Sequence, residues 1–148
     1  MQGRGAVKVT ASRELLASRR DVWRFIEEPF HMPDWWPGLT GVQPDRRGMA
    51  PGARWTVTST SELVLLRKPQ STGLLLVQRV VPPELAAWHL TAERLDVEVR
   101  LEALTEDRTL ATVTIEGRWM PEILSPRRRV PREALRRLHE LCQTAASL

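Results

Sequence analysis

Residues 95–119, LDVEVRLEALTEDRTLATVTIEGRW, decide the fold class of this 148-residue chain. Over residues 95–102 every second residue is apolar and the residues between them are charged. The alternation returns over residues 111–119, after a polar pair at Glu106-Asp107. A period of two is typical of strands that bury one face, and so short a connection joins antiparallel neighbours. The stretch therefore predicts an antiparallel hairpin.

Further strands are predicted on the N-terminal side of this hairpin. Their bounds come from alternating or apolar segments that end at Pro or Gly: residues 7–13, 39–44, 54–61, 74–81 and 86–91. Together with the hairpin they indicate an antiparallel sheet of about six to seven strands.

Helical signals interrupt the strand pattern near the N-terminus. Ser18 is expected to cap a helix, with Asp21 three residues later as a short form of the capping box, and Pro29 is expected to end it. Val22, Phe25 and Ile26 form its expected buried stripe.

Two more helical segments follow from proline spacing and periodicity. Pro29, Pro33 and Pro37 recur every four residues, so this segment is predicted to be a short helical turn that presents Trp35 and Trp36. Near the C-terminus the apolar spacing becomes that of a helix, which tolerates Pro131 in its first turn. Its predicted apolar face consists of Leu135, Leu138, Leu141, Cys142 and Ala145.

Composition limits the protein class. Apolar residues make up 42% and charged residues 27% of the chain, ordinary values for one globular domain over residues 1–148. The net charge of +4 comes entirely from residues 118–148, which hold seven arginines and three glutamates. A chain that is otherwise neutral is a poor candidate for general nucleic-acid binding, so we expect no DNA partner. The first residues resemble no secretory signal and no apolar run approaches a membrane span, so we expect a cytoplasmic protein.

Four segments carry a resemblance to a known superfamily. They are residues 17–26 (ASRRDVWRFI), 32–38 (MPDWWPG), 51–55 (PGARW) and 80–88 (VVPPELAAW). In this order, within nearly the whole chain, they resemble the SRPBCC superfamily, whose START-like or Bet v 1-like members share the helix-grip fold, and within it the polyketide cyclase/dehydrase-like group.

The resemblance implies an α+β fold with a definite architecture. A curved antiparallel sheet would wrap around a long C-terminal helix, with two short helices after the first strand. It also implies a cavity between sheet and helix that takes lipids, quinones or polyketides. The chain departs from the plant members in lacking their glycine-rich loop, since residues 45–52 read DRRGMAPG, and it has neither Tyr nor Asn.

The alternation also predicts which side chains would line such a cavity. The expected inward residues of the strands are Val7, Val9, Ala11, Trp55, Val57, Ser59, Ser61, Trp88, Leu90, Val97, Val99, Leu101, Val113, Ile115 and Trp119. We add Trp36 from the proline-rich turn and Leu138 from the last helix. Either Gln78 or Arg79 should contribute a polar group, and we take Arg79 as the candidate although the surrounding strand is apolar on both faces. The alternative is that this set is simply a packed core; the tryptophans are the better candidates, because an indole N–H needs a partner.

Catalytic candidates are few. His31 and Asp34 lie three residues apart in the proline-rich turn and could form a proton-transferring pair. The alternative is an exposed histidine beside an aspartate that caps the turn. His89 is expected on the outer face of its strand and His139 at the edge of the core. The single cysteine, Cys142, stands at helical spacing and is interpreted as a small core residue. One cysteine cannot form a Cys-based zinc site, so we expect no metal. We also expect no organic cofactor.

The basic segment allows three interpretations. Its arginines could form a solvated helix face, because Glu133 stands three and four residues before two of them. They could instead contact an acidic partner such as RNA or an acidic protein, or an anionic membrane surface. The arginines concerned are Arg127, Arg128, Arg129, Arg132, Arg136 and Arg137.

Three functional hypotheses follow. The first is a non-enzymatic protein that binds or carries a hydrophobic small molecule such as a lipid, quinone or polyketide-like compound. The second is a polyketide cyclase or dehydratase that uses the same cavity, with His31, Asp34 and Arg79 moving protons. The third is an interaction module that docks through its arginine-rich C-terminal segment.

Overall fold

The computed structural model describes residues 6–60, 71–118 and 126–146. Within these residues one antiparallel sheet has the strand order β1-β7-β6-β5-β4-β3-β2. Its strands are β1 (Ala6–Leu15), β2 (Leu39–Gln43), β3 (Arg54–Ser59), β4 (Ser71–Val81), β5 (Leu85–Leu90), β6 (Leu95–Thr105) and β7 (Arg108–Arg118). The helical elements are α1 (Arg19–Glu27), the 3-10 helix η1 (Pro29–His31), α2 (Met32–Trp35), the 3-10 helix η4 (Pro126–Arg129) and α3 (Val130–Ala146).

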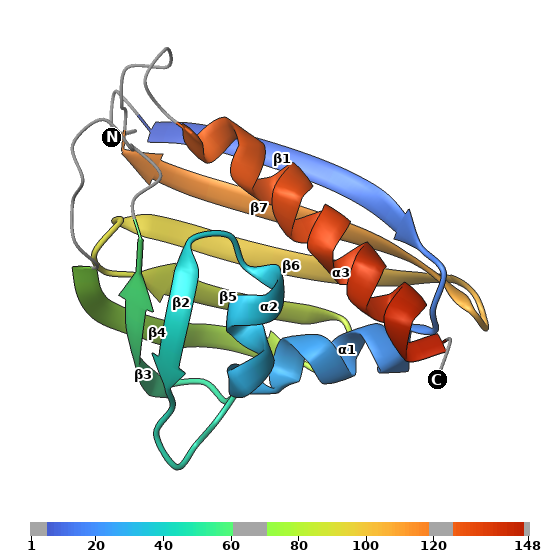
Figure 1. The fold of residues 1–148 in the computed structure, drawn as a ribbon, viewed down its shortest axis with the longest axis horizontal. Helices are drawn as coiled ribbons and strands as arrows, with labels where there is room; N and C mark the ends of the chain where they lie inside the picture. The colour runs from blue at the N-terminus through green and yellow to red at the C-terminus, as the bar shows by residue number, and fades with distance from the viewer. Residues whose placement is uncertain (1–5, 61–70, 119–125, 147–148) are drawn as a thin grey trace.

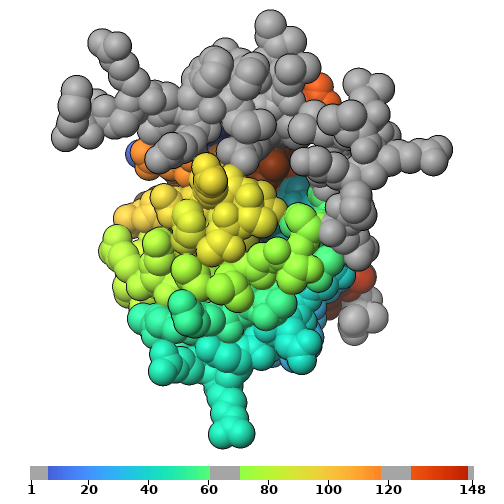
Figure 2. Space-filling model, turned by 90° about the vertical axis from the view of Figure 1, so that its left-hand side faces the viewer, coloured from blue at the N-terminus to red at the C-terminus, as the bar shows by residue number. Residues whose placement is uncertain are grey.

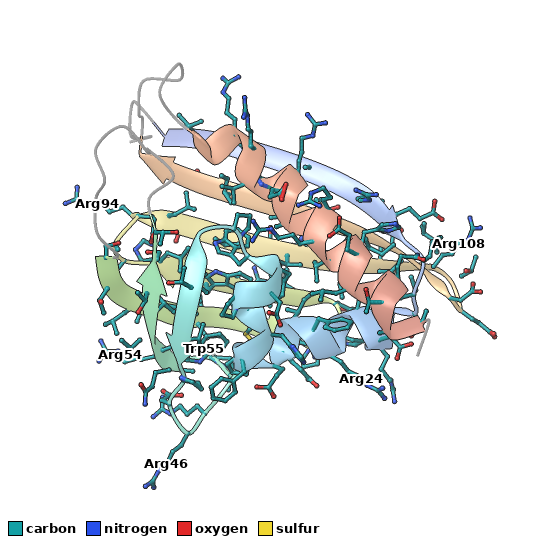
Figure 3. All side chains as sticks on the ribbon, in the orientation of Figure 1. Arg24, Arg46, Arg54, Trp55, Arg94 and Arg108 are labelled. Atoms are coloured by element: carbon teal, nitrogen blue, oxygen red, sulfur yellow. The ribbon has the colours of Figure 1, made fainter. Side chains whose placement is uncertain are left out.

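The helices cover one face of the curved sheet (Figure 1). α3 runs obliquely across it and packs on β1 and β7, while α2 contacts both α3 and β2. The β2–β3 loop projects from the body of the molecule with Arg46 at its tip (Figures 2 and 3). The helix-grip architecture predicted from the sequence is therefore confirmed.

The central hairpin has the predicted register. Val97 faces Ile115 and Val99 faces Val113 across β6 and β7, and all four side chains are buried. β-Branched side chains paired on one face stabilise neighbouring strands. The connection at residues 106–107 is the turn that the sequence indicates.

The helix termini also follow the local sequence signals. The backbone N–H of Asp21 donates to Ser18 Oγ at 3.1 Å, which caps α1. The helix ends at Glu27, two residues before Pro29. Phe25, expected in its buried stripe, is only half-buried, and Trp23 is buried instead.

α3 turns its apolar side towards the sheet, as its spacing predicts. Its buried residues are Pro131, Ala134, Leu135, Leu138 and Cys142. Ala145, expected on this face, is exposed in the last turn of the helix.

Candidate functional site

The candidate site is the sheet face that α2 and α3 cover. The expected inward strand residues that are buried are Trp55, Val57, Ser59, Trp88, Leu90, Val97, Val99, Leu101, Val113 and Ile115. Val7, Val9 and Ala11 in β1 are half-buried, because β1 forms an edge of the sheet. Ser61 and Trp119 lie outside the described residues. The interior face is thus apolar almost throughout, while a ligand-contacting role for its residues stays a prediction.

Arg79 is a correction to the expected lining. Gln78 and Arg79 are both exposed, so neither adds a polar group to the buried interior. The pairing of β4 with β5 shifts between Val77 and Arg79, which leaves one extra residue in β4. Such a bulge interrupts the alternation of inward and outward side chains. Because β4 is apolar on both faces here, the sequence does not indicate which of its residues point inward.

Three tryptophans meet at the centre of this interior. Trp35 and Trp36 come from the end of α2, and Trp88 comes from β5. The ring centroids lie 5.8 Å apart for Trp35 and Trp36, 6.0 Å for Trp35 and Trp88, and 5.9 Å for Trp36 and Trp88. All three contacts are edge-to-face, the arrangement that aromatic quadrupoles favour. We call these three residues the tryptophan cluster.

Local backbone geometry places α2 over the sheet. α2 has only four residues, and Trp36 already leaves the helix in an extended conformation. Gly38 then turns the chain into β2 with φ of +82°, a conformation that favours glycine. A Cβ at this position would stand 3.3 Å from the carbonyl oxygen of Thr60. Both Trp35 and Trp36 are thereby held against the sheet.

The indole N–H groups of the interior differ in their hydrogen bonding. Trp55 Nε1 donates to the carbonyl oxygen of Gly48 at 2.9 Å. Trp23 Nε1, Trp35 Nε1 and Trp88 Nε1 are buried and have no hydrogen-bond partner among the described residues, and Trp35 and Trp88 are 0% exposed. An unsatisfied buried donor costs about 1–3 kcal/mol. Two of these three donors, those of Trp35 and Trp88, belong to the tryptophan cluster and find no acceptor among the described residues.

The immediate neighbours of Trp88 in the sheet cannot accept a hydrogen bond through their side chains. Trp88 stands opposite Val77 of β4 and Val97 of β6. Its same-face neighbours along β5 are Ala86 and Leu90, and all four are buried. Trp88 Nε1 is thus set in an apolar part of the sheet.

A second polar feature lies at one end of the interior. Ser59 in β3 is 7% exposed, and its hydroxyl donates to Glu93 Oε1 at 2.8 Å. Ser59 Oγ also lies 3.3 Å from Ser71 Oγ. Ser59 was expected to face inward, but Glu93 was not expected there. It lies in the turn between β5 and β6, where strand alternation gives no signal.

His31 and Asp34 lie together, as the sequence suggests. His31 Nδ1 is 3.4 Å from Asp34 Oδ2, and the ring of His31 packs edge-to-face on Phe25 with centroids 5.4 Å apart. Their side chains are 44% and 54% exposed, so water solvates both groups. Their role as an acid–base pair stays a prediction.

The remaining titratable candidates behave as the sequence indicates. His89 Nδ1 lies 2.9 Å from Asp96 Oδ1, a partner whose side chain is 57% exposed on the outer face. His139 is half-buried on α3, and its Nδ1 is buried without a hydrogen-bond partner among the described residues. Cys142 is buried, and this burial raises the pKa of its thiol to about 11. A thiol that stays protonated at neutral pH is a poor nucleophile, which fits a core residue.

The arginines of α3 are largely engaged within the helix. Glu133 accepts hydrogen bonds from Arg136 Nε at 3.0 Å and from Arg137 Nε at 3.3 Å, and Arg136 also pairs with Glu140. These arginines lower the pKa of Glu133 to about 2. Arg129 and Arg132 are exposed, and the side chain of Arg127 lies outside the described residues. The paired residues favour the interpretation as a solvated helix face.

In the described parts of the chain no group of three or more His, Cys, Asp or Glu side chains could hold a metal ion. None of the described helices is long and apolar enough to cross a membrane.

Comparison with solved structures supports the fold. Ara h 8.0201 is 10% identical, with a TM-score of 0.67 over 95% of this chain and 99% of the other. A norcoclaurine synthase mutant from Thalictrum flavum, solved with a transition-state analogue, is 15% identical, with a TM-score of 0.68 over 98% and 99% of the chains. The chain also matches about half of the di-domain aromatase/cyclase StfQ of steffimycin biosynthesis, at 11% identity and a TM-score of 0.71 over 97% of this chain and 53% of StfQ.

Sequence comparisons add nothing further, since no family model and no curated protein matches the chain. At such low identities the structural likeness shows the fold alone, because one fold can serve many functions. The chain therefore shares the helix-grip fold of these proteins, as its four motifs and its order of elements predict.

Proposed function

We propose that this protein binds or carries a hydrophobic small molecule, such as a lipid, quinone or polyketide-like compound, between the sheet and α3. The observation that carries this proposal is the tryptophan cluster. Binding sites for small molecules are mostly apolar and aromatic, with a few placed polar groups. The interior has this character, and two donors of the tryptophan cluster have no partner among the described residues.

A packed core without a ligand is the competing interpretation. Native cores leave few buried donors unsatisfied, whereas here two lie in one group of touching rings. A ligand that enters this region would account for both donors. The related fold of proteins with small-molecule chemistry in their names, such as norcoclaurine synthase and StfQ, supports the same proposal.

Binding can be measured with the tryptophans themselves. Protein purified without detergent is extracted with organic solvent, and the extract is analysed by mass spectrometry. Ligand-free protein is then titrated with a panel of apolar compounds while tryptophan emission is recorded. We expect a bound compound in the extract or a saturable emission change with part of the panel. Absence of both results would reject the proposal.

A pair of variants tests where the compound binds. Val97→Phe adds bulk beside Trp88 on the interior face, whereas Leu104→Phe adds similar bulk at a position that is 46% exposed. We expect Val97→Phe to weaken binding at least tenfold and Leu104→Phe to leave it unchanged. Overpacking of a core costs about 1–3 kcal/mol, so thermal unfolding is recorded for both variants.

A cyclase or dehydratase that uses the same interior is the second candidate. The contact between His31 and Asp34 favours it, because a histidine beside a carboxylate can accept and return a proton. With a polyketide-type substrate, alanine at both positions should abolish turnover and leave the fold intact. Unchanged turnover in this double variant would exclude the pair from the chemistry.

A further inference from the structure

The two unpartnered indoles of the tryptophan cluster, Trp35 and Trp88, also restrict the chemistry of the ligand. We infer that the ligand carries a carbonyl-type oxygen that accepts hydrogen bonds from Trp35 Nε1 and Trp88 Nε1, an inference that rests on the proposed binding function. It goes beyond that function because it separates carbonyl-bearing aromatic compounds from plain hydrocarbon-like lipids.

An indole N–H is a donor only, so its partner must be an acceptor. Among the described residues the buried polar side chains are Ser59 and Thr109, and each is already bonded. Ser59 donates to Glu93, and Thr109 donates to the carbonyl oxygen of Ala17 at 2.8 Å. Neither hydroxyl is a partner of the two indoles, so the buried polar side chains of the described residues leave both donors unsatisfied.

Water is a poor partner for this place. A buried water molecule typically needs two to four polar neighbours, including acceptors for its own hydrogens. Beside Trp88 the sheet presents Val77, Val97, Ala86 and Leu90. A water that accepted from the indoles would leave its own O–H groups unsatisfied in this apolar environment, and a ligand hydroxyl would do the same with its single O–H. A carbonyl oxygen has two lone pairs and no hydrogen. It can therefore accept hydrogen bonds from both indoles without leaving an unsatisfied O–H donor.

The two donors belong to rings that contact each other. The rings of Trp35 and Trp88 have centroids 6.0 Å apart and planes inclined at 76°. Trp36 contacts both rings from the side. A flat aromatic ligand that contacts these rings would gain stacking energy, while its carbonyl group would supply the acceptor. The site therefore favours an aromatic ketone or quinone over an aliphatic chain.

Trp55 provides a matched control within the same interior. It is also 0% exposed, but its Nε1 already donates to Gly48. Removing this indole changes the bulk of the core without removing a donor that is available to a ligand. Trp55 is labelled in Figure 3, between the ribbon of β2 and that of the short helices.

The experiment compares two probes of nearly identical shape, 9-fluorenone and fluorene, which differ in a carbonyl group against a methylene. Equilibrium dialysis gives the affinity of the wild type and of the Trp35→Phe, Trp88→Phe and Trp55→Phe variants for each probe. We expect the wild type to prefer fluorenone by about fivefold or more for each donor that engages it. Trp35→Phe and Trp88→Phe should each reduce this preference, and the double variant should abolish it. Trp55→Phe should retain it.

Infrared spectroscopy gives a second measurement that needs no variant. A hydrogen-bonded carbonyl absorbs at lower frequency than a free one. We therefore expect the fluorenone band to shift downwards in the wild-type complex relative to hydrocarbon solvent, so the test does not depend on the folding of a variant.

The outcomes separate this inference from the proposed function. Equal affinities for both probes, or a preference that survives in the double variant, would overturn the inference and leave the binding function intact. An unshifted carbonyl band in the complex would also overturn it. If the wild type binds neither probe, and if no compound is extracted and no panel member changes tryptophan emission, the binding function and the inference fail together.

Discussion

The outer face of α3 and the interior beneath α2 differ in how their polar groups are satisfied. On α3, Glu133 accepts from Arg136 and Arg137, and water reaches all three side chains. In the interior, Trp35 and Trp88 are fully buried, and no described residue accepts a hydrogen bond from their N–H groups. The charged groups on the outer face of α3 are thus satisfied by one another and by water, whereas the two indole donors of the interior are not.

This difference shows which polar groups carry functional information. Exposed ion pairs contribute little to stability and need no external partner, since solvent screens them. A buried donor without an acceptor is costly, so a ligand that supplies the acceptor gains affinity there. For this reason we base the function on the indoles rather than on the arginines.

The largest predicted effect tests whether the tryptophan cluster is truly packed. Trp88→Ala removes a ring that is 0% exposed and touches both Trp35 and Trp36. Substitutions of this kind cost about 3–5 kcal/mol of unfolding free energy. Urea denaturation followed by circular dichroism measures the loss. As the matched change on the outer face of α3, Arg136→Ala should cost at most about 1 kcal/mol. Equal losses at the two positions would remove the contrast between the regions.

Much of the fold is predictable from local sequence patterns. Alternation over residues 95–119 gives the central hairpin because its two faces meet different environments. The same alternation in the segments 54–61 and 86–91 places Trp55 and Trp88 on the buried face. The cap at Ser18 depends on a few neighbouring residues, so sequence reasoning finds it as well.

The arrangement of the site is less predictable, for three physical reasons. Trp36 meets Trp88 through tertiary packing of α2 on the sheet, and no local pattern connects residues so distant in the chain. The bulge at Arg79 interrupts an apolar strand in which both faces look alike. Glu93 lies in a turn, where no period assigns a face. The hydrogen bonding of the indoles depends on the tertiary packing of α2 on the sheet, so no local sequence pattern predicts it.

A smaller effect is expected where the interior satisfies its own polar group. Ser59→Ala removes the hydroxyl that donates to Glu93 and should cost about 1 kcal/mol. Ser12 is a matched control, because its Oγ lies 2.8 Å from Thr112 Oγ on the exposed face of the sheet. Ser12→Ala should change stability by less than about 0.5 kcal/mol. Thermal unfolding compares the two, and equal losses would show that burial adds nothing to the Ser59 bond.

The pairing of charges on α3 predicts a modest dependence of stability on pH. The pKa of Glu133 falls from 4.5 to about 2 in the folded protein, chiefly because Arg136 donates to its carboxylate. The contribution is therefore complete above pH 4.5 and is lost as pH falls towards 2. Since the side chains of Glu133 and Arg136 are 32% and 47% exposed, it amounts to only about 0.5–1 kcal/mol. Glu133→Gln should reduce stability at pH 7 and flatten the decline between pH 4.5 and 2.

Salt provides the control for this prediction. In 1 M salt the Debye length is about 3 Å, so exposed pairs are screened. The difference between wild type and Glu133→Gln should shrink under that condition, whereas the loss in Trp88→Ala should persist. A salt-resistant Glu133 effect would mean that α3 buries these charges more deeply than their exposure indicates.

The smallest effect on stability is expected at His31 and Asp34. Their contact spans 3.4 Å between half-exposed side chains, so the double alanine variant should lose about 0.5 kcal/mol or less. Thermal unfolding and fluorene affinity are measured together in this variant. Unchanged affinity would separate the pair from the ligand and favour a carrier over an enzyme. A tenfold loss of affinity with unchanged stability would place the pair beside the ligand. The acid–base hypothesis would then gain the proximity to substrate that a proton donor requires.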